Sequence, residues 1–152
     1  MAKTIPFERT LAVRDACLCL HTRRAARAIA RRFDAAFRPL GLTNGQFSLL
    51  AGLNLPEPRP MAPVARLLGM DRTSLTAMLK PLEARGVVSV EVDPEDRRGR
   101  RIGLTAKGRR LLARAVPIWE STHAEIEAAL SGEVADGLRA GLKALEVEAA
   151  ES

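Results

Sequence analysis

Apolar residues recur at intervals of three and four along most of the chain, which predicts helices with one buried face. The first helix is expected from about Asp15 to Arg38, where Pro39 and Gly41 end it. Its apolar positions are Leu18, Ala25, Ile29, Phe33 and Phe37. We therefore expect the phenylalanines of this segment to lie in the core.

Two shorter helices are expected next. Thr43 is a plausible N-cap for the segment NGQFSLLAGL, and Gln46 three residues later completes a capping box. The run NLPEPRP then interrupts regular structure, because each proline lacks a backbone N–H donor. After this run, residues 64–68 are expected to form a short helix that Gly69 closes.

A fourth helix is predicted after Asp71, a strong N-cap residue. Its apolar positions should face the core, whereas Thr76, Ala77 and Lys80 should face outward. The apolar positions are Leu75, Met78, Leu79 and Leu82. Gly86 is a suitable end for this helix.

The helical spacing then gives way to alternation. VVSVEVD and RRIGL read as two strands joined by a turn at DPED, so a hairpin is expected. A long helix should run from Thr105 to about Leu130, and a last helix should carry the stripe Val134, Leu138, Leu142 and Leu145. The chain should therefore be mainly α with one small β-hairpin.

Charge is distributed unevenly along the chain, whose formal net charge is +6. Residues 97–114 hold eight basic side chains and no acid, whereas the segment from Pro117 onward holds eight acids and two bases. The eight acids are Glu120, Glu125, Glu127, Glu133, Asp136, Glu146, Glu148 and Glu151. This asymmetry indicates that the middle of the chain binds a polyanion, although a solvated charged face is the simpler alternative.

The middle of the chain has the layout of a helix-turn-helix followed by a wing. A short helix, a turn at Gly69 and Met70, and a helix that begins DRTS match a motif whose second helix enters the major groove of DNA. Arg72 can pair with guanine, hydroxyl groups can meet bases or phosphates, and Lys80 can reach the backbone. The arginine-rich hairpin that follows would then enter the minor groove, with Gly99 allowing a close approach.

The segment VARLLGMDRTSLTAMLKPLEARGVVSVEVDPEDRRGRRIGLTAKGRRLL resembles the winged-helix core of the MarR family of bacterial transcription regulators. DPEDRRGRRIGLTAKG is similar to the wing signature of that family, and the likeness covers roughly residues 12 to 150. The resemblance implies a single chain, 1–152, with a winged helix-turn-helix DNA-binding lobe at 41–111 and dimerisation helices at 12–40 and 112–150. It further implies a homodimer on a palindromic operator, usually a repressor released by a ligand or an oxidant.

The resemblance also implies roles for individual residues. Asp96 would brace the wing by pairing with an arginine, and Arg98 would enter the minor groove. The supporting phosphate contacts would come from Arg97, Arg100 and Arg101. On the recognition helix, the positions that meet DNA in relatives are Arg72, Thr73, Ser74 and Thr76, with Lys80 beside them. Simple solvent exposure is the alternative for Thr76 and Lys80.

A signal site is harder to assign. The resemblance places Cys19 where relatives that sense hydroperoxides carry a reactive cysteine, and it lets Phe33 and Phe47 roof an effector cavity. Small buried packing residues are the alternative for Cys17 and Cys19. Both lie in a stretch that reads as helical, which would point them to opposite faces and prevent a disulfide between them.

Other classes of function find little support. No spacing of histidine, cysteine or paired carboxylates suggests a metal, a cofactor or an enzyme active site. A non-specific RNA-binding or nucleoid-type module remains an alternative, although few aromatic side chains are present to stack on bases. The first 20 residues do not read as a secretory signal, so a cytoplasmic protein is expected.

Overall fold

The structure is a computed structural model that describes residues 4–151, with side chains described up to Glu146. The acidic side chains Glu148 and Glu151, and the outermost ends of the predicted single chain, lie outside the described residues. The elements in chain order are α1 (Phe7–Ala16), α2 (Leu18–Phe37), the 3-10 turn η1 (Arg38–Leu40), α3 (Asn44–Gly52), β1 (Arg59–Pro60), α4 (Met61–Leu67), α5 (Arg72–Ala84), β2 (Val88–Val92), β3 (Arg100–Leu104), α6 (Ala106–Ala128) and α7 (Gly132–Glu151).

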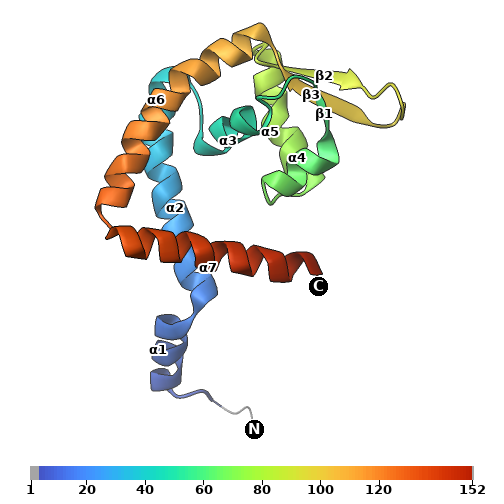
Figure 1. Cartoon of the computed structure of the whole chain (residues 1–152). Helices are drawn as coiled ribbons and strands as arrows, with labels where there is room; N and C mark the ends of the chain where they lie inside the picture. The colour runs from blue at the N-terminus through green and yellow to red at the C-terminus, as the bar shows by residue number, and fades with distance from the viewer. Residues whose placement is uncertain (1–3, 152) are drawn as a thin grey trace.

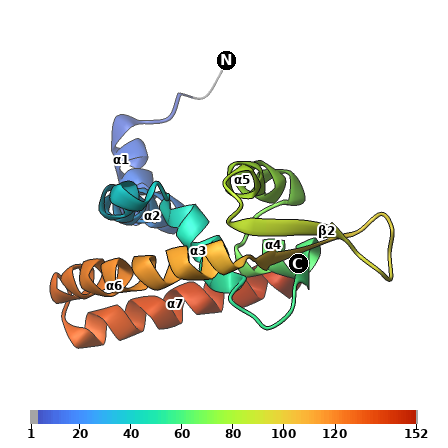
Figure 2. The ribbon, with the colours of Figure 1, turned by 90° about the horizontal axis from the view of Figure 1, so that it is seen from above.

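Two long helices form a stalk that carries a smaller lobe at one end (Figure 1). The stalk consists of α2 and α6, which pack side by side, and the lobe consists of α3, α4, α5 and the sheet. Helix α1 extends beyond the far end of α2, and α7 returns across the stalk (Figures 1 and 2). Within the part of the chain that the structure describes, no helix is long and apolar enough to span a membrane.

The hairpin forms as predicted and gains a third strand. The sheet order is β1-β3-β2, all antiparallel, with Val90 opposite Ile102 and Arg59 also opposite Ile102. The proline run was expected only to interrupt the chain, but Arg59 and Pro60 pair with β3 at the edge of the sheet. An edge strand tolerates proline because its outer N–H groups need no ladder partner. Two residues are too few to show an alternating pattern in sequence.

The predicted first helix is divided. Cys17 adopts an extended conformation between α1 and α2, and its sulfur accepts a hydrogen bond of 3.4 Å from the Leu20 N–H as the N-cap of α2. The expectation that Cys17 lies within a helix was therefore wrong. Helix α1 buries none of its residues in the single chain, so nothing in its packing imposes a straight continuation.

The starts of α3, α5 and α6 were predicted correctly, because each has a side-chain cap. Helix α4 has no side-chain cap and begins at Met61, three residues before the predicted start. Thr43 and Gln46 form the full capping box of α3, with hydrogen bonds of 3.1 and 3.2 Å. Asp71 accepts the Ser74 N–H at 2.8 Å, and Thr105 accepts the Gly108 N–H at 3.0 Å. These caps satisfy N–H groups that the first turn of a helix leaves free.

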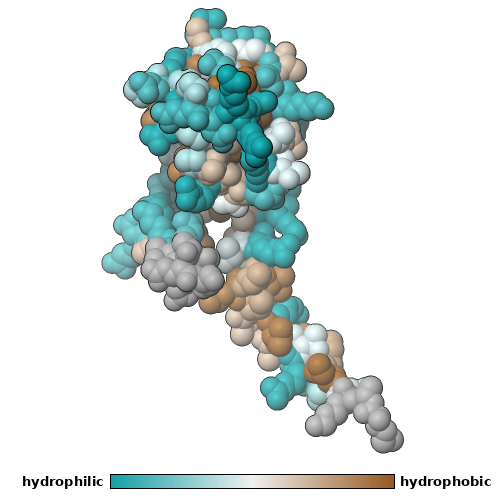
Figure 3. Space-filling view, turned by 90° about the vertical axis from the view of Figure 1, so that its right-hand side faces the viewer, coloured by the Kyte–Doolittle hydropathy of each residue, from teal (hydrophilic) through white to brown (hydrophobic). Residues whose placement is uncertain are grey.

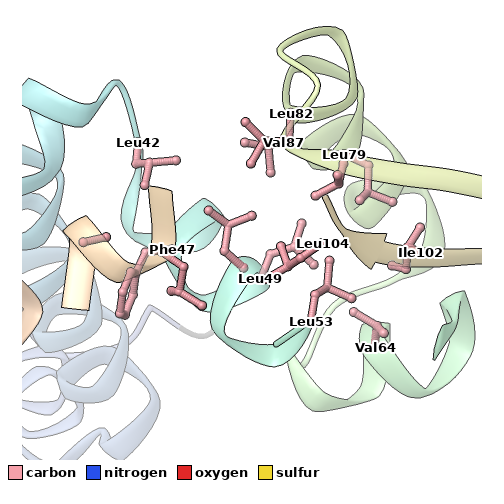
Figure 4. Close-up of a cluster of buried hydrophobic side chains, with 14 of the residues drawn as sticks. Leu42, Phe47, Leu49, Leu53, Val64, Leu79, Leu82, Val87, Ile102 and Leu104 are labelled. Atoms are coloured by element: carbon pink, nitrogen blue, oxygen red, sulfur yellow. The ribbon is translucent and has the colours of Figure 1, made fainter. Parts of the chain in front are cut away.

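One hydrophobic core joins the lobe to the stalk. Leu75, Leu79 and Leu82 of α5 are buried, as the spacing predicted, whereas Met78 is only half-buried. The cluster contains the side chains shown in Figure 4, among them Leu49, Leu53, Val64, Val87, Ile102 and Leu104. Its position fixes α5 against the sheet and leaves the opposite face of α5 in solvent.

Candidate nucleic-acid interface

The turn between α4 and α5 sets the direction of the second helix. Gly69 has a φ of 61°, a left-handed conformation that favours glycine, and Met70 N–H donates to the Ala65 carbonyl at 3.0 Å. The chain then reaches Asp71, which caps α5 and places its first turn at the surface. The predicted helix-turn-helix geometry is present.

The outward face of α5 carries the side chains that sequence reasoning selected. Those side chains are exposed, while Leu75 and Leu79 on the reverse face are buried. The exposed set is Arg72, Thr73, Ser74, Thr76 and Lys80. The exposed face is therefore free to meet a ligand as large as a duplex.

Two hydroxyl groups on this face are already engaged as donors. Ser74 Oγ donates to Asp71 Oδ2 at 2.8 Å, and Thr76 Oγ1 donates to the Arg72 carbonyl at 2.8 Å. A hydroxyl has one proton, and phosphate oxygens only accept. In this geometry, Ser74 and Thr76 can therefore only accept from base N–H groups, and a phosphate contact would require each to break its present hydrogen bond.

Asp71 adds a fixed negative charge at the start of α5. The Ser74 N–H, followed by the Ser74 hydroxyl, lowers the pKa of this carboxyl group below its ordinary value. The carboxylate therefore stays ionised at neutral pH. The Asp71 carboxylate already accepts the Ser74 N–H, which a bound phosphate would otherwise use. The positive charge of the first turn of α5 therefore comes from the Arg72 side chain.

A groove of about 400 Å³ separates α5 from the hairpin. Arg72, Thr76 and Lys80 line its helix side, and Arg98 and Arg100 line its hairpin side. The structure thus brings residues about 26 positions apart in the chain into one basic surface, the α5–wing groove.

Sequence reasoning missed one charged member of the α5–wing groove. Glu83 also lines the groove and contributes the opposite charge. It lies three residues after Lys80 on the same helix face, so its spacing could have identified it.

The turn of the hairpin is held by carboxylates that bind backbone groups. Asp96 Oδ1 accepts the Arg98 N–H at 2.9 Å, and Asp93 Oδ1 accepts the Glu95 N–H at 3.0 Å. Asp96 was predicted to pair with an arginine, and it does so through the backbone N–H of Arg98; none of the ion pairs found among the described residues joins it to an arginine side chain. Within the hairpin, the carboxylate that lies near an arginine side chain is that of Asp93, whose Oδ2 is 3.8 Å from Arg101 Nε. Asp96 still braces the wing, but by fixing its backbone.

Gly99 has a local reason to be glycine. A Cβ at this position would lie 3.1 Å from the Asp96 carbonyl oxygen and 3.2 Å from Asp93 Cβ. Those distances are tighter than ordinary contacts, so a side chain at this position would require the turn to shift by a few tenths of an ångström. Close approach of Gly99 to DNA stays a prediction.

The four hairpin arginines differ in their exposure and in their hydrogen bonds. Arg97 and Arg98 are exposed at the tip, and Arg100 donates to the Gly99 carbonyl at 3.0 Å. Arg101 is half-buried and lines a different pocket, formed with the proline run. Successive strand residues point to opposite faces, which explains why Arg100 faces the α5–wing groove and Arg101 does not.

The candidate signal residues do not form one site. Cys19 is exposed, so the expectation of a buried packing cysteine is wrong for this residue in the single chain. Phe33 and Phe47 are buried around Phe37, whose ring lies 5.9 Å from Phe33 and 4.7 Å from Phe47. Cys19 precedes Phe33 on the same helix by roughly 20 Å, at about 1.5 Å per residue. The two phenylalanines are core residues here.

Comparison with known proteins adds evidence on the family. A model of the MarR family matches residues 40–99. The transcriptional regulator HosA of Escherichia coli O111:H- is 45% identical over 62 residues, which cover 41% of this chain and 46% of that protein. The match thus spans about half the length of this curated relative.

Solved structures extend the likeness to most of the chain. The transcriptional regulator MosR of M. tuberculosis, solved in complex with DNA, is 41% identical with a TM-score of 0.78, covering 89% of this chain and 96% of that chain. The transcriptional repressor CouR bound to a 23-mer DNA duplex is 29% identical with a TM-score of 0.78, covering 94% and 99%. CouR from Rhodococcus jostii RHA1 bound to p-coumaroyl-CoA is 25% identical with a TM-score of 0.74, covering 87% and 93%.

Proposed function

The chain belongs to the MarR family of transcriptional regulators, and from that premise we propose that it binds DNA as a sequence-specific regulator of transcription. In this proposal α5 enters the major groove, and the tip of the β2–β3 hairpin enters the adjacent minor groove. The observation that carries the proposal is the α5–wing groove. It joins Arg72 and Lys80 of the helix to Arg98 and Arg100 of the hairpin on one exposed surface.

Each part of the proposed surface has a distinct physical task. Arg72 has the donors to read a guanine, and Thr73, Ser74 and Thr76 surround it on the same exposed turn. Arg97 and Arg98 project from the hairpin tip, where the negative potential of a narrow minor groove attracts arginine. Lys80 and Arg100 would add phosphate contacts from the groove, and Arg101 would add one from the opposite face of the hairpin.

We further propose that two copies associate through residues 12–40 and 112–150, with the lobe at 41–111 left to bind DNA. The stripe on α7 supports this, because Val134, Leu138 and Leu145 are 53%, 47% and 50% exposed in the single chain. Exposed apolar surface also lies on the elements below the lobe, brown in Figure 3. A two-fold dimer would present two copies of α5, which fits a palindromic operator.

Release of DNA by a small-molecule ligand completes the proposed regulator, which would act as a repressor. The support comes from CouR, a repressor whose solved structures include one with DNA and one with p-coumaroyl-CoA. The same combination of a DNA-bound form and a ligand-bound form is proposed for this chain, with a ligand of its own. It would act as a regulator and not as an enzyme.

The test is fluorescence anisotropy on DNA from upstream of the gene that encodes this chain, measured over a series of salt concentrations. Each lost phosphate contact lowers the slope of log K against log salt by about 0.9. Arg98→Ala should weaken binding and lower this slope. Arg24→Ala removes the same charge from α2, away from the groove, and should change neither. Equal slopes for the wild type and Arg98→Ala would contradict the proposed wing contact.

Oxidation at Cys19 is a second candidate signal, favoured by the exposure of that thiol. The Cys19 thiol would lose its proton and attack the terminal oxygen of an organic hydroperoxide; the O–O bond breaks, Cys19 becomes a sulfenic acid, and the leaving alkoxide takes up the proton and departs as the alcohol. Hydroperoxide should then reduce DNA binding by the wild type, but not by Cys19→Ser. Loss of binding by both proteins would assign the effect elsewhere.

A further inference from the structure

A second basic surface lies away from the α5–wing groove. It is a pocket of about 250 Å³ lined by four cationic side chains and by apolar residues. The cationic side chains are Arg85, Lys107, Arg110 and Arg114, and the apolar residues are Pro39, Leu40, Val87 and Leu111. They come from the turn after α2, the segment after α5 and the first three turns of α6. We call this the α6 pocket.

Backbone carbonyls hold two of the four cations in place. Arg85 donates to the Gly41 carbonyl at 2.6 Å and to the Leu40 carbonyl at 3.0 Å, and Lys107 Nζ donates to the Arg85 carbonyl at 2.7 Å. Gly41 has a φ of 62° and passes about 3.7 Å from the Arg85 guanidinium. This wall of the pocket is therefore built before any ligand arrives.

Among the described residues, the positive charge of the α6 pocket has no acidic partner. None of the ion pairs found among the described residues involves Arg85, Lys107, Arg110 or Arg114, and no acid lines the pocket. Arg85 uses two of its five donors on carbonyls, and Lys107 uses one of its three. Several donors thus remain to meet an anion, which would relieve the mutual repulsion of the cations.

The α6 pocket is separate from the proposed DNA surface. It shares no lining residue with the α5–wing groove. Arg85 follows Arg72 by 13 residues, which places them roughly 20 Å apart along the helix axis. The exposed first turn of α5 and the hairpin tip therefore belong to one surface, and the α6 pocket belongs to another.

The floor of the pocket determines what kind of anion fits. Leu40 and Val87 are buried beneath it, and Leu111 is half-buried. Arginine guanidinium groups match carboxylate and phosphate oxygens in paired hydrogen bonds, while this apolar floor favours a carbon skeleton over a bare ion. We propose that the α6 pocket binds a small organic anion, a carboxylate or phosphate monoester on an apolar body.

Isothermal titration calorimetry of the full chain, without DNA, tests the proposal with four probes. Benzoate and phenyl phosphate carry both features, inorganic phosphate carries only the charge, and benzyl alcohol carries only the apolar body. At least one of the first two should bind more tightly than either of the others. If none of the four probes binds, or if inorganic phosphate or benzyl alcohol binds as tightly as the charged aromatic probes, the proposal is wrong.

The matched variants are Arg110→Gln with Arg114→Gln, and Arg24→Gln with Arg27→Gln. Both pairs remove two charges from exposed helix positions. Arg85 and Lys107 stay intact, so the carbonyl contacts that hold the wall are kept. The α6 pair should weaken binding of the aromatic anion at least tenfold, whereas the α2 pair should leave it unchanged. Equal weakening by both pairs would indicate a general charge effect and overturn the proposal.

A DNA phosphate is the alternative occupant of the α6 pocket. The salt dependence of duplex binding distinguishes it from a small organic anion. If the pocket contacted the DNA backbone, the Arg110 and Arg114 pair would lower the salt slope of duplex binding by about two units. We expect an unchanged slope. A lower slope would overturn the proposal of a separate organic-anion site.

Discussion

The same substitution at two glycines should destabilise the protein at one and not at the other. Gly108 lies in the first turn of α6, where a Cβ would clash with the Val87 carbonyl oxygen and lie 3.2 Å from Leu104 Cδ2. That carbonyl cannot easily move, because it accepts Thr105 N–H at 3.2 Å and Thr105 Oγ1 at 3.1 Å. Gly45 lies in the first turn of α3, and its Cβ would meet only the flexible end of Met78, at 3.0 Å.

These contacts set the expected magnitudes. Replacing glycine by alanine within a helix gains about 1 kcal/mol, because alanine loses less backbone entropy. Overpacking against fixed backbone costs about 1–3 kcal/mol. Because the clash at Gly108 is with backbone, its cost should lie in the upper half of that range, about 2–3 kcal/mol, and Gly108→Ala should lower the free energy of unfolding by about 1–2 kcal/mol. Gly45→Ala should leave it unchanged or raise it by up to about 1 kcal/mol.

Urea unfolding followed by circular dichroism measures both variants against the wild type. The two midpoints should move apart, with Gly108→Ala below the wild type and Gly45→Ala at or above it. A Gly108→Ala protein as stable as the wild type would show that α6 does not pack against the Val87 carbonyl. The hairpin and the stalk would then meet through other contacts than this one.

Three other variants test the site and the proposed dimer. Leu138→Glu with Leu142→Glu should convert a dimer into a monomer in analytical ultracentrifugation, and an unchanged mass would refute the role of the α7 stripe. Glu83→Gln should raise DNA affinity by up to about fivefold, because it removes the repulsion between the Glu83 carboxylate and the DNA phosphates, and an exposed pair of charges is worth about 0.2–1 kcal/mol. Unchanged affinity would show that Glu83 lies away from the phosphates. Asp71→Ala should lower thermal stability at neutral pH. Because folding lowers the pKa of Asp71, the stabilisation by its carboxylate is present above the unfolded pKa of about 3.9 and is lost as the pH falls through the pKa of the folded state. If the difference in melting temperature between the variant and the wild type persisted in strong acid, the N-cap role of Asp71 would be refuted.

Local sequence signals predicted most of the fold. The caps at Thr43, Asp71 and Thr105 each fix a helix start through bonds within three residues, so they can be identified without knowing the tertiary structure. The hairpin is similarly local, because its two strands follow each other in the chain. The break at Cys17 was missed, since cysteine is not a usual N-cap residue and the helical spacing continues through it.

The exposed residues of the candidate site were predicted from the sequence, but their hydrogen bonds were not. Exposure of Arg72, Thr76 and Lys80 follows from helix periodicity, and exposure of Arg98 follows from its place at a hairpin tip. Sequence alone could not show that the Ser74 and Thr76 hydroxyl protons are already used, because that depends on side-chain geometry. The α6 pocket also escaped prediction, since Leu40, Arg85 and Arg114 meet only through tertiary packing.

The central claim is that the α5–wing groove reads a DNA sequence. The most direct measurement is a competition experiment, in which the protein bound to labelled upstream DNA is challenged with unlabelled upstream duplex, random duplex and RNA. A specific regulator should be displaced by its own duplex at concentrations at least a thousandfold lower, since specific sites typically bind about 10³–10⁷ times more tightly. Equal displacement by all three competitors would contradict the account and identify a non-specific basic module.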